Sequence, residues 1–418
     1  MNILVIGNGF DLAHGLPTKY TDFLEFAMVM RQVVDSGVPK DRIDYGKLTP
    51  AIVALLKQNM QTLNVSEWKE LIYENLWIKY FLYNPLYEKE NWIDFESEIS
   101  KVIQQLDYDM FSTEGKKCEL TDSMVNLSNE FLTQIYSRYT LVVQSMNALT
   151  SGKCESITFK EIRDRLYTDL NKLIRALELY LTDYVEKLEC KLVSPDIEGI
   201  ARTFVDHNDG KRGVILSKVL SFNYTNTYKR VYFPNTSVES NMDHIHGKAD
   251  SGNSIETNNM VLGIDEYLSD ERKNKDVEFI AFKKFFQRIH KGTGCKYKEW
   301  VDKIIEDASH YEGANKVVMQ QVVSGTIDRE GIKNKISKHI HYLYIFGHSL
   351  DVTDRDILRD LILNDNVYTT IFYLNKDVMG QQIANLVKVI GQDELIRRTG
   401  GSTKTIEFKL QQDMVERN

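Results

Sequence analysis

The spacing of apolar side chains divides the chain into two kinds of segment. An apolar run over residues 3–6 predicts a buried strand near the N-terminus. Apolar residues then recur every three or four positions after Thr18, which predicts a helix that ends before Gly37 and Pro39. The same helical spacing continues from about residue 48 to residue 203, without alternating stretches. This long middle part is therefore predicted to be helical.

Short apolar runs typical of strands return in the second half of the chain. They cover residues 219–225, 243–247, 259–265, 342–346, 369–373 and 405–410, and helical patterns lie between several of them. Alternation of strands and helices favours a mostly parallel sheet with helices on both faces. We therefore predict an α/β, Rossmann-like fold from residues 1–40 and 210–418, with a large all-helical insertion at residues 41–209.

Composition narrows the function classes. The chain has 418 residues and a formal net charge of -8, so neither nucleic acid nor a membrane surface is an expected partner. No apolar run approaches the roughly 20 residues that span a bilayer, and the N-terminus lacks a signal-peptide pattern, so we expect a cytoplasmic protein. The four cysteines are far apart, which argues against a zinc ribbon or a disulfide framework. They are Cys118, Cys154, Cys190 and Cys295.

A glycine-rich loop follows the first strand. Gly7 and Gly9 stand where glycines let a backbone approach a phosphate, although Leu12 occupies the third glycine position of the dinucleotide pattern. A tight strand-to-helix turn without a ligand is the alternative. The acidic residue that binds ribose in oxidoreductases has only Asp35 as a candidate, at a helix end, which disfavours that class.

Polar residues follow two later strands. Asn223 and Thr225 come after the run at residues 219–222, where an asparagine side chain can hold a ribose hydroxyl or cap a turn. His244 and His246 are two residues apart, so they could bind a metal, or one could serve as a general base. A hydrogen-bonded histidine without a catalytic role is the third interpretation.

The run at residues 342–346 leads into Gly347, His348, Ser349 and Leu350. Gly347 permits close backbone approach, and the Ser349 hydroxyl can contact ribose or phosphate. Three aspartates follow, and they either chelate magnesium or favour the N-terminus of the next helix through its dipole. They are Asp351, Asp354 and Asp356.

Taken in order, these motifs resemble the AbiH family of bacterial phage abortive-infection proteins. The matching segments are "GNGFDLAHGLPTKYTDF", "NWIDFE", "FNYT", "HIHG" and "GHSLDVTDRDIL". The resemblance covers the whole chain and implies a protein that responds to phage infection. A phage-derived trigger, or formation of a homo-oligomer through the helical part, would then control it.

The same motifs are more distantly similar to sirtuin-like NAD-binding domains. That similarity implies NAD, or an ADP-ribose derivative, as ligand or substrate and cleavage of the nicotinamide–ribose bond, with no metal. Asn223 and His246 match the catalytic positions. The positions that match nucleotide-binding residues are Gly7, Asn8, Gly9, Asp11, Gly15, Leu16, Pro17, Thr225, Gly347, Ser349 and Leu350. Two departures stand out: Thr225 replaces an aspartate, and the paired zinc cysteines are missing, which disfavours protein deacetylation.

Two other functions fit the same motifs. A nucleotide-binding sensor would use the glycine loops without chemistry at Asn223 or His246. A metal-dependent nuclease would use His244, His246 and acidic residues. All interpretations of a shared site require that the strands before Gly7, Asn223, His246 and Gly347 lie in one parallel sheet, with their loops at one edge.

Overall fold

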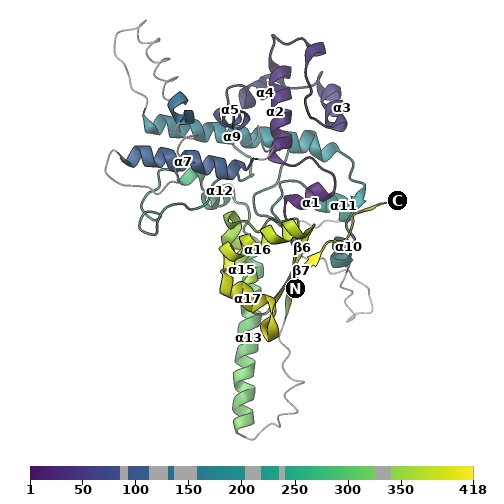
Figure 1. Ribbon diagram of the computed structural model, residues 1–418, viewed down its shortest axis with the longest axis vertical. Helices are drawn as coiled ribbons and strands as arrows, with labels where there is room; N and C mark the ends of the chain where they lie inside the picture. The colour runs from purple at the N-terminus through teal and green to yellow at the C-terminus, as the bar shows by residue number, and fades with distance from the viewer. Residues whose placement is uncertain are drawn as a thin grey trace. The chain divides into compact units, whose positions relative to one another are not determined.

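A computed structural model describes residues 1–84, 93–112, 130–135, 158–202, 218–234, 241–324 and 340–417 (Figure 1). The contacts divide the chain into two compact units. Unit 1 comprises Met1–Leu16, Glu189–Lys248 and Thr293–Asn418, and unit 2 comprises Pro17–Leu188 and Ala249–Gly292. The predicted organisation, with a discontinuous domain at 1–40 and 210–418 and a helical insertion at 41–209, stays a prediction.

Unit 1 is built on a six-stranded sheet in the order β4-β3-β1-β5-β6-β7. Every neighbouring pair is parallel. The strands are β1 (Asn2–Ile6), β3 (Lys218–Ser221), β4 (Met242–His244), β5 (His341–Phe346), β6 (Val367–Tyr373) and β7 (Ile406–Leu410). A separate antiparallel pair joins β2 (Leu192–Val193) to β8 (Val415–Glu416).

Successive residues of β1 point to opposite faces of this sheet, and each face is covered. Ile3 and Val5 belong to a core that includes side chains of the helices α13 (Tyr297–Val323), α15 (Arg355–Ile362) and α16 (Lys376–Ile390). Leu4 and Ile6 belong to a second core with side chains of α1 (Asn8–Ala13), α10 (Pro195–Arg202) and α11 (Thr227–Tyr232). Burial on both faces explains why the strands read as continuous apolar runs.

The helices of unit 1 connect these strands and cover the sheet. Figure 1 shows α15, α16 and α17 beside β6 and β7. The helices of unit 1 are α1 (Asn8–Ala13), α10 (Pro195–Arg202), α11 (Thr227–Tyr232), α13 (Tyr297–Val323), α15 (Arg355–Ile362), α16 (Lys376–Ile390) and α17 (Gln392–Thr399), with the short 3-10 turns η5 (Val352–Asp354) and η6 (Gly401–Thr403).

Unit 2 is helical over its described residues and is centred on α9 (Phe159–Asp183), which contacts α2 (Tyr20–Val34), α4 (Val65–Ile72) and α5 (Leu76–Leu82). Thr158 and Glu161 form a reciprocal capping box that starts α9. The other helices of unit 2 are α2 (Tyr20–Val34), α3 (Pro50–Asn59), α4 (Val65–Ile72), α5 (Leu76–Leu82), α7 (Phe95–Ser112) and α12 (Lys284–Lys291), with the 3-10 turns η1 (Lys40–Arg42), η2 (Val185–Lys187) and η4 (Ile280–Phe282).

A buried carboxylate in α9 holds residues 249–260 within unit 2. Glu178 is fully buried and accepts hydrogen bonds from the backbone N–H of Asp250 and the side-chain amide of Asn253. Its second oxygen accepts from the Arg175 guanidinium and the Asn258 amide. The apolar run at residues 259–265 was predicted to be a strand, but it does not join the six-stranded sheet. It forms one isolated β-bridge, between Ile264 and Lys283.

The predicted α/β class with a mostly parallel sheet is confirmed. The more specific prediction is confirmed as well: the strands that precede Gly7, Asn223, His246 and Gly347 are β1, β3, β4 and β5 of one parallel sheet. Because parallel strands share their direction, the four following loops leave the sheet at the same edge.

Candidate functional site

The loops after β1 and β5 contact each other through glycine backbone. The Gly9 N–H donates to the Gly347 carbonyl at 2.8 Å. A Cβ atom on Gly7 would lie 2.8 Å from the Gly347 oxygen, and one on Gly9 would lie 2.8 Å from the Gly347 Cα. Real Cβ atoms do not approach backbone so closely, so the close contact of the two loops itself requires these glycines. The Phe10 N–H also stays inside the protein, because it donates to the Gly7 carbonyl.

The loop after β3 is tied to the loop after β1 by side chains. The Asn223 amide Nδ2 donates to the Gly7 carbonyl at 3.0 Å, across 216 residues of sequence. The Thr225 hydroxyl donates to the Asp11 carboxylate at 2.6 Å. All three side chains, those of Asp11, Asn223 and Thr225, are buried. The predicted residues Asn223, Thr225 and Asp11 are therefore brought together with the first glycine loop.

The two histidines of the "HIHG" segment have different partners. His244 Nδ1 lies 3.2 Å from the Asn223 carbonyl oxygen, to which it can donate. His246 follows the end of β4, and its Nε2 atom lies 3.2 Å from Asp354 Oδ1. Among the residues that the structure describes, no group of three or more histidine, cysteine or acidic side chains is placed to hold a metal ion.

Asp354 also approaches a second histidine. Its Oδ2 atom lies 3.4 Å from His348 Nε2, and Asp354 and both histidines are buried. Phe222, after β3, packs edge-on against both imidazole rings, with centroids 5.5 Å from His246 and 4.3 Å from His348. The local sequence indicated only a helix-dipole or magnesium role for Asp354, because its contacts with the histidines 6 and 108 residues N-terminal to it arise from tertiary structure.

The remaining predicted binding residues differ in exposure. Asn8, Gly15 and Ser349 are exposed at this edge, and Gly15 adopts a φ of 77° with open space around it. Leu16 and Leu350 are buried, so they contribute to the shape of the loops. Pro17 belongs to unit 2, where its carbonyl accepts from the Tyr180 hydroxyl at 2.8 Å. Their roles toward a ligand stay predictions.

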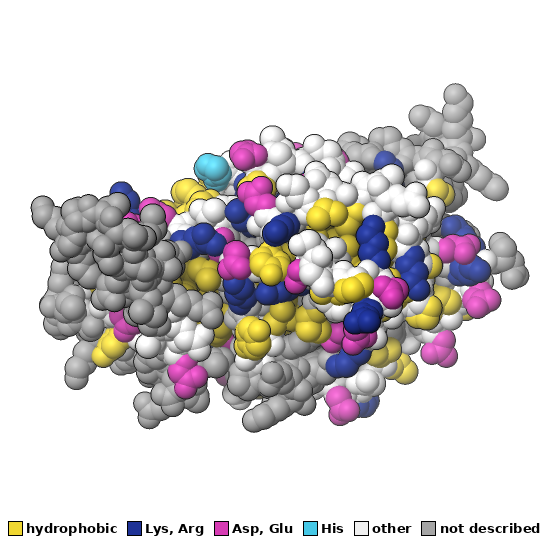
Figure 2. Space-filling model, turned by 90° about the horizontal axis from the view of Figure 1, so that it is seen from above, with side chains coloured by type: hydrophobic (Ala, Val, Ile, Leu, Met, Phe, Trp, Pro, Cys, Tyr) yellow, Lys and Arg dark blue, Asp and Glu magenta, His cyan; other side chains and the backbone are white. Residues whose placement is uncertain are grey.

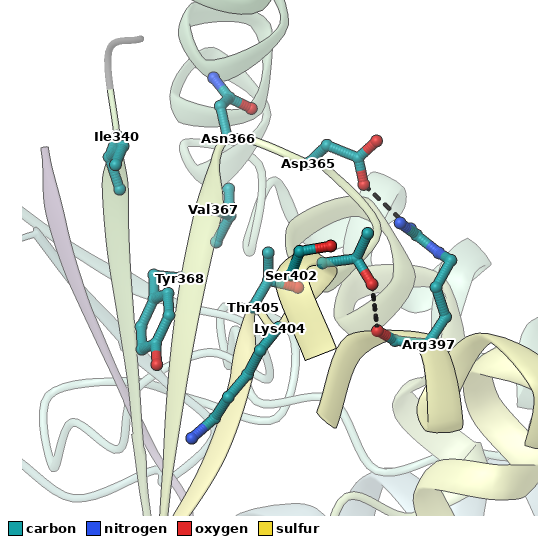
Figure 3. A pocket seen from close by; sticks show the side chains of 10 residues that line it. Ile340, Asp365, Asn366, Val367, Tyr368, Arg397, Ser402, Lys404 and Thr405 are labelled. Carbon is teal, nitrogen blue, oxygen red and sulfur yellow. Dashed lines mark hydrogen bonds and ion pairs between the residues drawn. The ribbon is translucent and has the colours of Figure 1, made fainter. Parts of the chain in front are cut away.

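A cavity of about 310 Å³ lies at the opposite edge of the sheet, near the start of β5, β6 and β7 (Figure 3). Two of its charged groups pair with each other, because the Arg397 guanidinium donates to Asp365, and the Thr403 hydroxyl donates to the Arg397 carbonyl. Arg398 behind it is fully buried and is paired with Glu394 and Asp365. This pairing accounts for the polar residues without a ligand.

The described surface carries mixed charge. Figure 2 shows basic side chains next to acidic and apolar ones across one face of the molecule. None of the helices within the described ranges combines the length and the apolar character that a bilayer crossing requires.

The environment of His244 makes the stability of unit 1 depend on pH. The pKa of His244 is lowered to about 4, mainly by burial and to a smaller extent by the positive charges of Lys248 and Lys296. The unfolded value is about 6.5, so the unfolded chain binds more protons between pH 6.5 and 4. Stability should therefore fall as the pH drops through this window, by about 3 kcal/mol from this group.

Urea unfolding followed by circular dichroism at a series of pH values measures this dependence. The control is His244→Asn, whose amide can replace the Nδ1–H donor to Asn223 but does not titrate. Between pH 6.5 and 4, the free energy of unfolding should depend less steeply on pH in the variant than in the wild type, and the difference should correspond to about one proton. Equal slopes for the two proteins would show that His244 is not buried in its neutral form. His14, whose pKa burial also lowers, remains in both.

Comparison with known proteins gives one match. No curated protein and no solved structure matches the chain. A family model described as bacteriophage abortive infection AbiH matches residues 3–374, which is most of the chain. The protein whose four sheet-edge loops are described above therefore belongs to the AbiH family of bacteriophage abortive-infection proteins.

Proposed function

We propose that this abortive-infection protein binds NAD, or another ADP-ribose derivative, at the carboxyl edge of its sheet and cleaves the nicotinamide–ribose bond when phage infection triggers it. One observation carries the proposal. The loops after β1, β3, β4 and β5 are far apart in sequence, yet hydrogen bonds and close contacts join them around His246, Asn223 and Asp354.

The sheet topology supports a nucleotide site at this edge. When the strands of the six-stranded sheet are renumbered in chain order, their order is 3-2-1-4-5-6, which is the order of Rossmann-like dinucleotide-binding folds. The order reverses between β1 and β5, and ligands of open parallel sheets bind at such a point. Asn8 and Ser349 follow these two strands and are exposed. In this proposal, the helical unit is the large insertion expected of a sirtuin-like relative.

The glycine contacts change the expected mode of phosphate binding. The Gly9 and Phe10 N–H groups at the start of α1 donate to carbonyls of the protein. A diphosphate would therefore be held by the exposed groups of the two loops, namely Asn8, Gly15 and Ser349, more than by the first turn of α1. We propose that Gly7, Gly9 and Gly347 serve the nucleotide indirectly, by keeping these loops in contact.

The proposed reaction breaks the bond between the ribose C1′ atom and the nicotinamide nitrogen, which leaves with the electron pair. The transition state has oxocarbenium character, as in other glycosidic cleavages. Water adds at C1′, and His246 accepts its proton or one from a ribose hydroxyl. Such general-base assistance contributes roughly 10²–10⁴-fold.

Two other residues would stabilise the oxocarbenium-like transition state and orient the attacking water. Asn223 holds the first glycine loop through the Gly7 carbonyl, and in this proposal it would also orient a water or ribose hydroxyl beside that loop. Thr225 carries no charge, but its hydroxyl donates to the Asp11 carboxylate at 2.6 Å. Asp11 would thus supply the negative charge that Thr225 lacks. The helical unit would hold the reaction off before infection, and a phage-derived trigger or a homo-oligomer contact through that unit would control its release.

Mass spectrometry of metabolites tests the reaction in cells that express the intact protein or His246→Ala, with and without phage. We expect NAD to fall and nicotinamide to rise in infected cells with the intact protein, and NAD to stay level with the variant. Cys295→Ser, which changes an exposed thiol, is the control and should behave as the intact protein. Cys118 lies outside the described residues. Full protection with unchanged NAD would contradict the proposal.

A nucleotide sensor is the second candidate. The observation that favours it is the internal use of the Asn223 amide and of the Gly9 and Phe10 N–H groups, which makes the loops a connected structural unit. A sensor would bind the nucleotide, protect against phage without consuming it, and keep protection in His246→Ala.

A further inference from the structure

Asp354 occupies a position between two imidazole rings. It is the last residue of η5 and directly precedes α15, so its carboxylate is favoured by the positive end of that helix. One carboxylate oxygen lies 3.2 Å from His246 Nε2, and the other lies 3.4 Å from His348 Nε2. The two histidines reach it from different loops, those after β4 and β5.

The proton position on His348 follows from a second contact. The Leu350 backbone N–H donates to His348 Nδ1 at 2.9 Å, so Nδ1 acts as the acceptor. A neutral imidazole with an acceptor at Nδ1 carries its proton on Nε2. His348 therefore presents an N–H group to Asp354 and has no basic atom left for a substrate.

The surroundings keep this arrangement rigid. The Gln382 amide donates to the His348 carbonyl at 3.1 Å, and the Asn385 amide donates to the Ser349 carbonyl at 3.0 Å. Leu350 is fully buried and adopts a φ of 59°, a left-handed conformation that costs a leucine about 1–2 kcal/mol. Such strain persists where the surrounding structure imposes it, and it is frequent at functional sites.

We infer that Asp354 is a positioning residue: it keeps the proton of His246 on Nε2, so that the lone pair on Nδ1 becomes the basic site. His348 fixes the orientation of the carboxylate from its other side. The inference rests on the proposed function for the role of His246 as a base. It assigns to Asp354 a role that neither a metal site nor a helix cap explains.

The test is Asp354→Asn, which preserves size and replaces one acceptor oxygen with an NH₂ donor. The Leu350 N–H still requires an acceptor at His348 Nδ1, so His348 should keep its proton on Nε2 and take the amide oxygen. The NH₂ group then faces His246, whose Nε2 must become an acceptor. His246 should switch to the Nδ1–H form, whereas His348 should not.

Two-bond ¹H–¹⁵N spectra of ¹⁵N-histidine-labelled full-length protein distinguish the two forms, with His246→Gln and His348→Gln used for assignment. We expect both histidines as Nε2–H in the wild type and His246 as Nδ1–H in Asp354→Asn. Phage protection should be lost in that variant at unchanged protein level. Asp356→Asn, an equal change at an exposed position two residues further on, should keep both the spectrum and protection.

The outcomes separate this inference from the proposed function. A wild-type His246 with its proton on Nδ1 would overturn the inference without any variant, even if Asp354→Asn failed to fold. Full protection by Asp354→Asn with a switched His246 would overturn it too. If the tautomer switches and protection is lost while NAD never changes, the inference stands and NAD cleavage is wrong. If the wild type consumes NAD but His246 keeps its proton on Nε2 in Asp354→Asn, the proposed NAD cleavage stands and the inference on Asp354 is wrong.

Discussion

Replacement of His246 with alanine should abolish protection against phage while the protein accumulates and folds normally. In the proposed reaction this histidine accepts the proton, and its loss removes roughly 10²–10⁴-fold of rate. The buried ring packs against Phe222, a residue of the sheet core, and lies beside Asp354 after β4, so its removal should cost some packing while the strands of the sheet stay paired. Plaque counts, an immunoblot and a circular dichroism spectrum measure the three quantities.

The matched control is His310→Ala, which removes an exposed histidine from α13 of the same unit. It should protect as well as the wild type. Normal protection by His246→Ala would favour the sensor and rule out this histidine as the base. If the level of His246→Ala protein is reduced, a loss of protection could result from the loss of protein alone. His246→Gln, which keeps more of the packing, then distinguishes loss of protein from loss of the base.

Asn223→Ala should also lose protection, and it should destabilise the fold more than His246→Ala does. The substitution removes the hydrogen bond from Nδ2 to the Gly7 carbonyl and leaves that buried acceptor without it, at a cost of about 1–3 kcal/mol. The two loops would then be held together less firmly. The melting temperature should fall slightly more for Asn223→Ala than for His246→Ala.

The strands of the sheet could be predicted because parallel strands are buried on both faces and read as apolar runs. From there the meeting of the four loops follows from sheet geometry alone. The run at residues 259–265 was misread for a physical reason. It is apolar because it is buried, but its neighbours are held to α9 by Glu178, and burial in a helical unit has the same local pattern as burial in a sheet.

The roles of single residues in the site were harder to predict. An aspartate before a helix usually has a helix-terminal role, and nothing local distinguishes Asp354 from Asp356. Only the folded chain brings His246 and His348 to it. Similarly, the glycines suggested a phosphate loop, and the structure adds a second reason for them, which is the contact between the loops after β1 and β5.

That contact leads to the second large expected effect, in which Gly347→Ala prevents stable folding of unit 1. Gly347 adopts a φ of 68°, and a Cβ atom there would lie 2.5 Å from the Gly9 carbonyl carbon and inside contact distance of the Phe10 nitrogen. The left-handed conformation costs an alanine about 1–2 kcal/mol. Overlap with backbone that cannot rotate away adds about 1–3 kcal/mol or more, which is a large share of the roughly 5–15 kcal/mol that stabilises a domain.

Gly15→Ala separates the two contributions, since Gly15 has a similar φ of 77° but nothing within 4 Å of an added Cβ. It should therefore show the conformational cost alone, about 1–2 kcal/mol. Thermal unfolding and the soluble yield of both variants measure the difference. An equal effect of the two substitutions would mean that the glycine loops separate easily in solution. The close contact between the loops after β1 and β5 would then not be what holds the candidate site together.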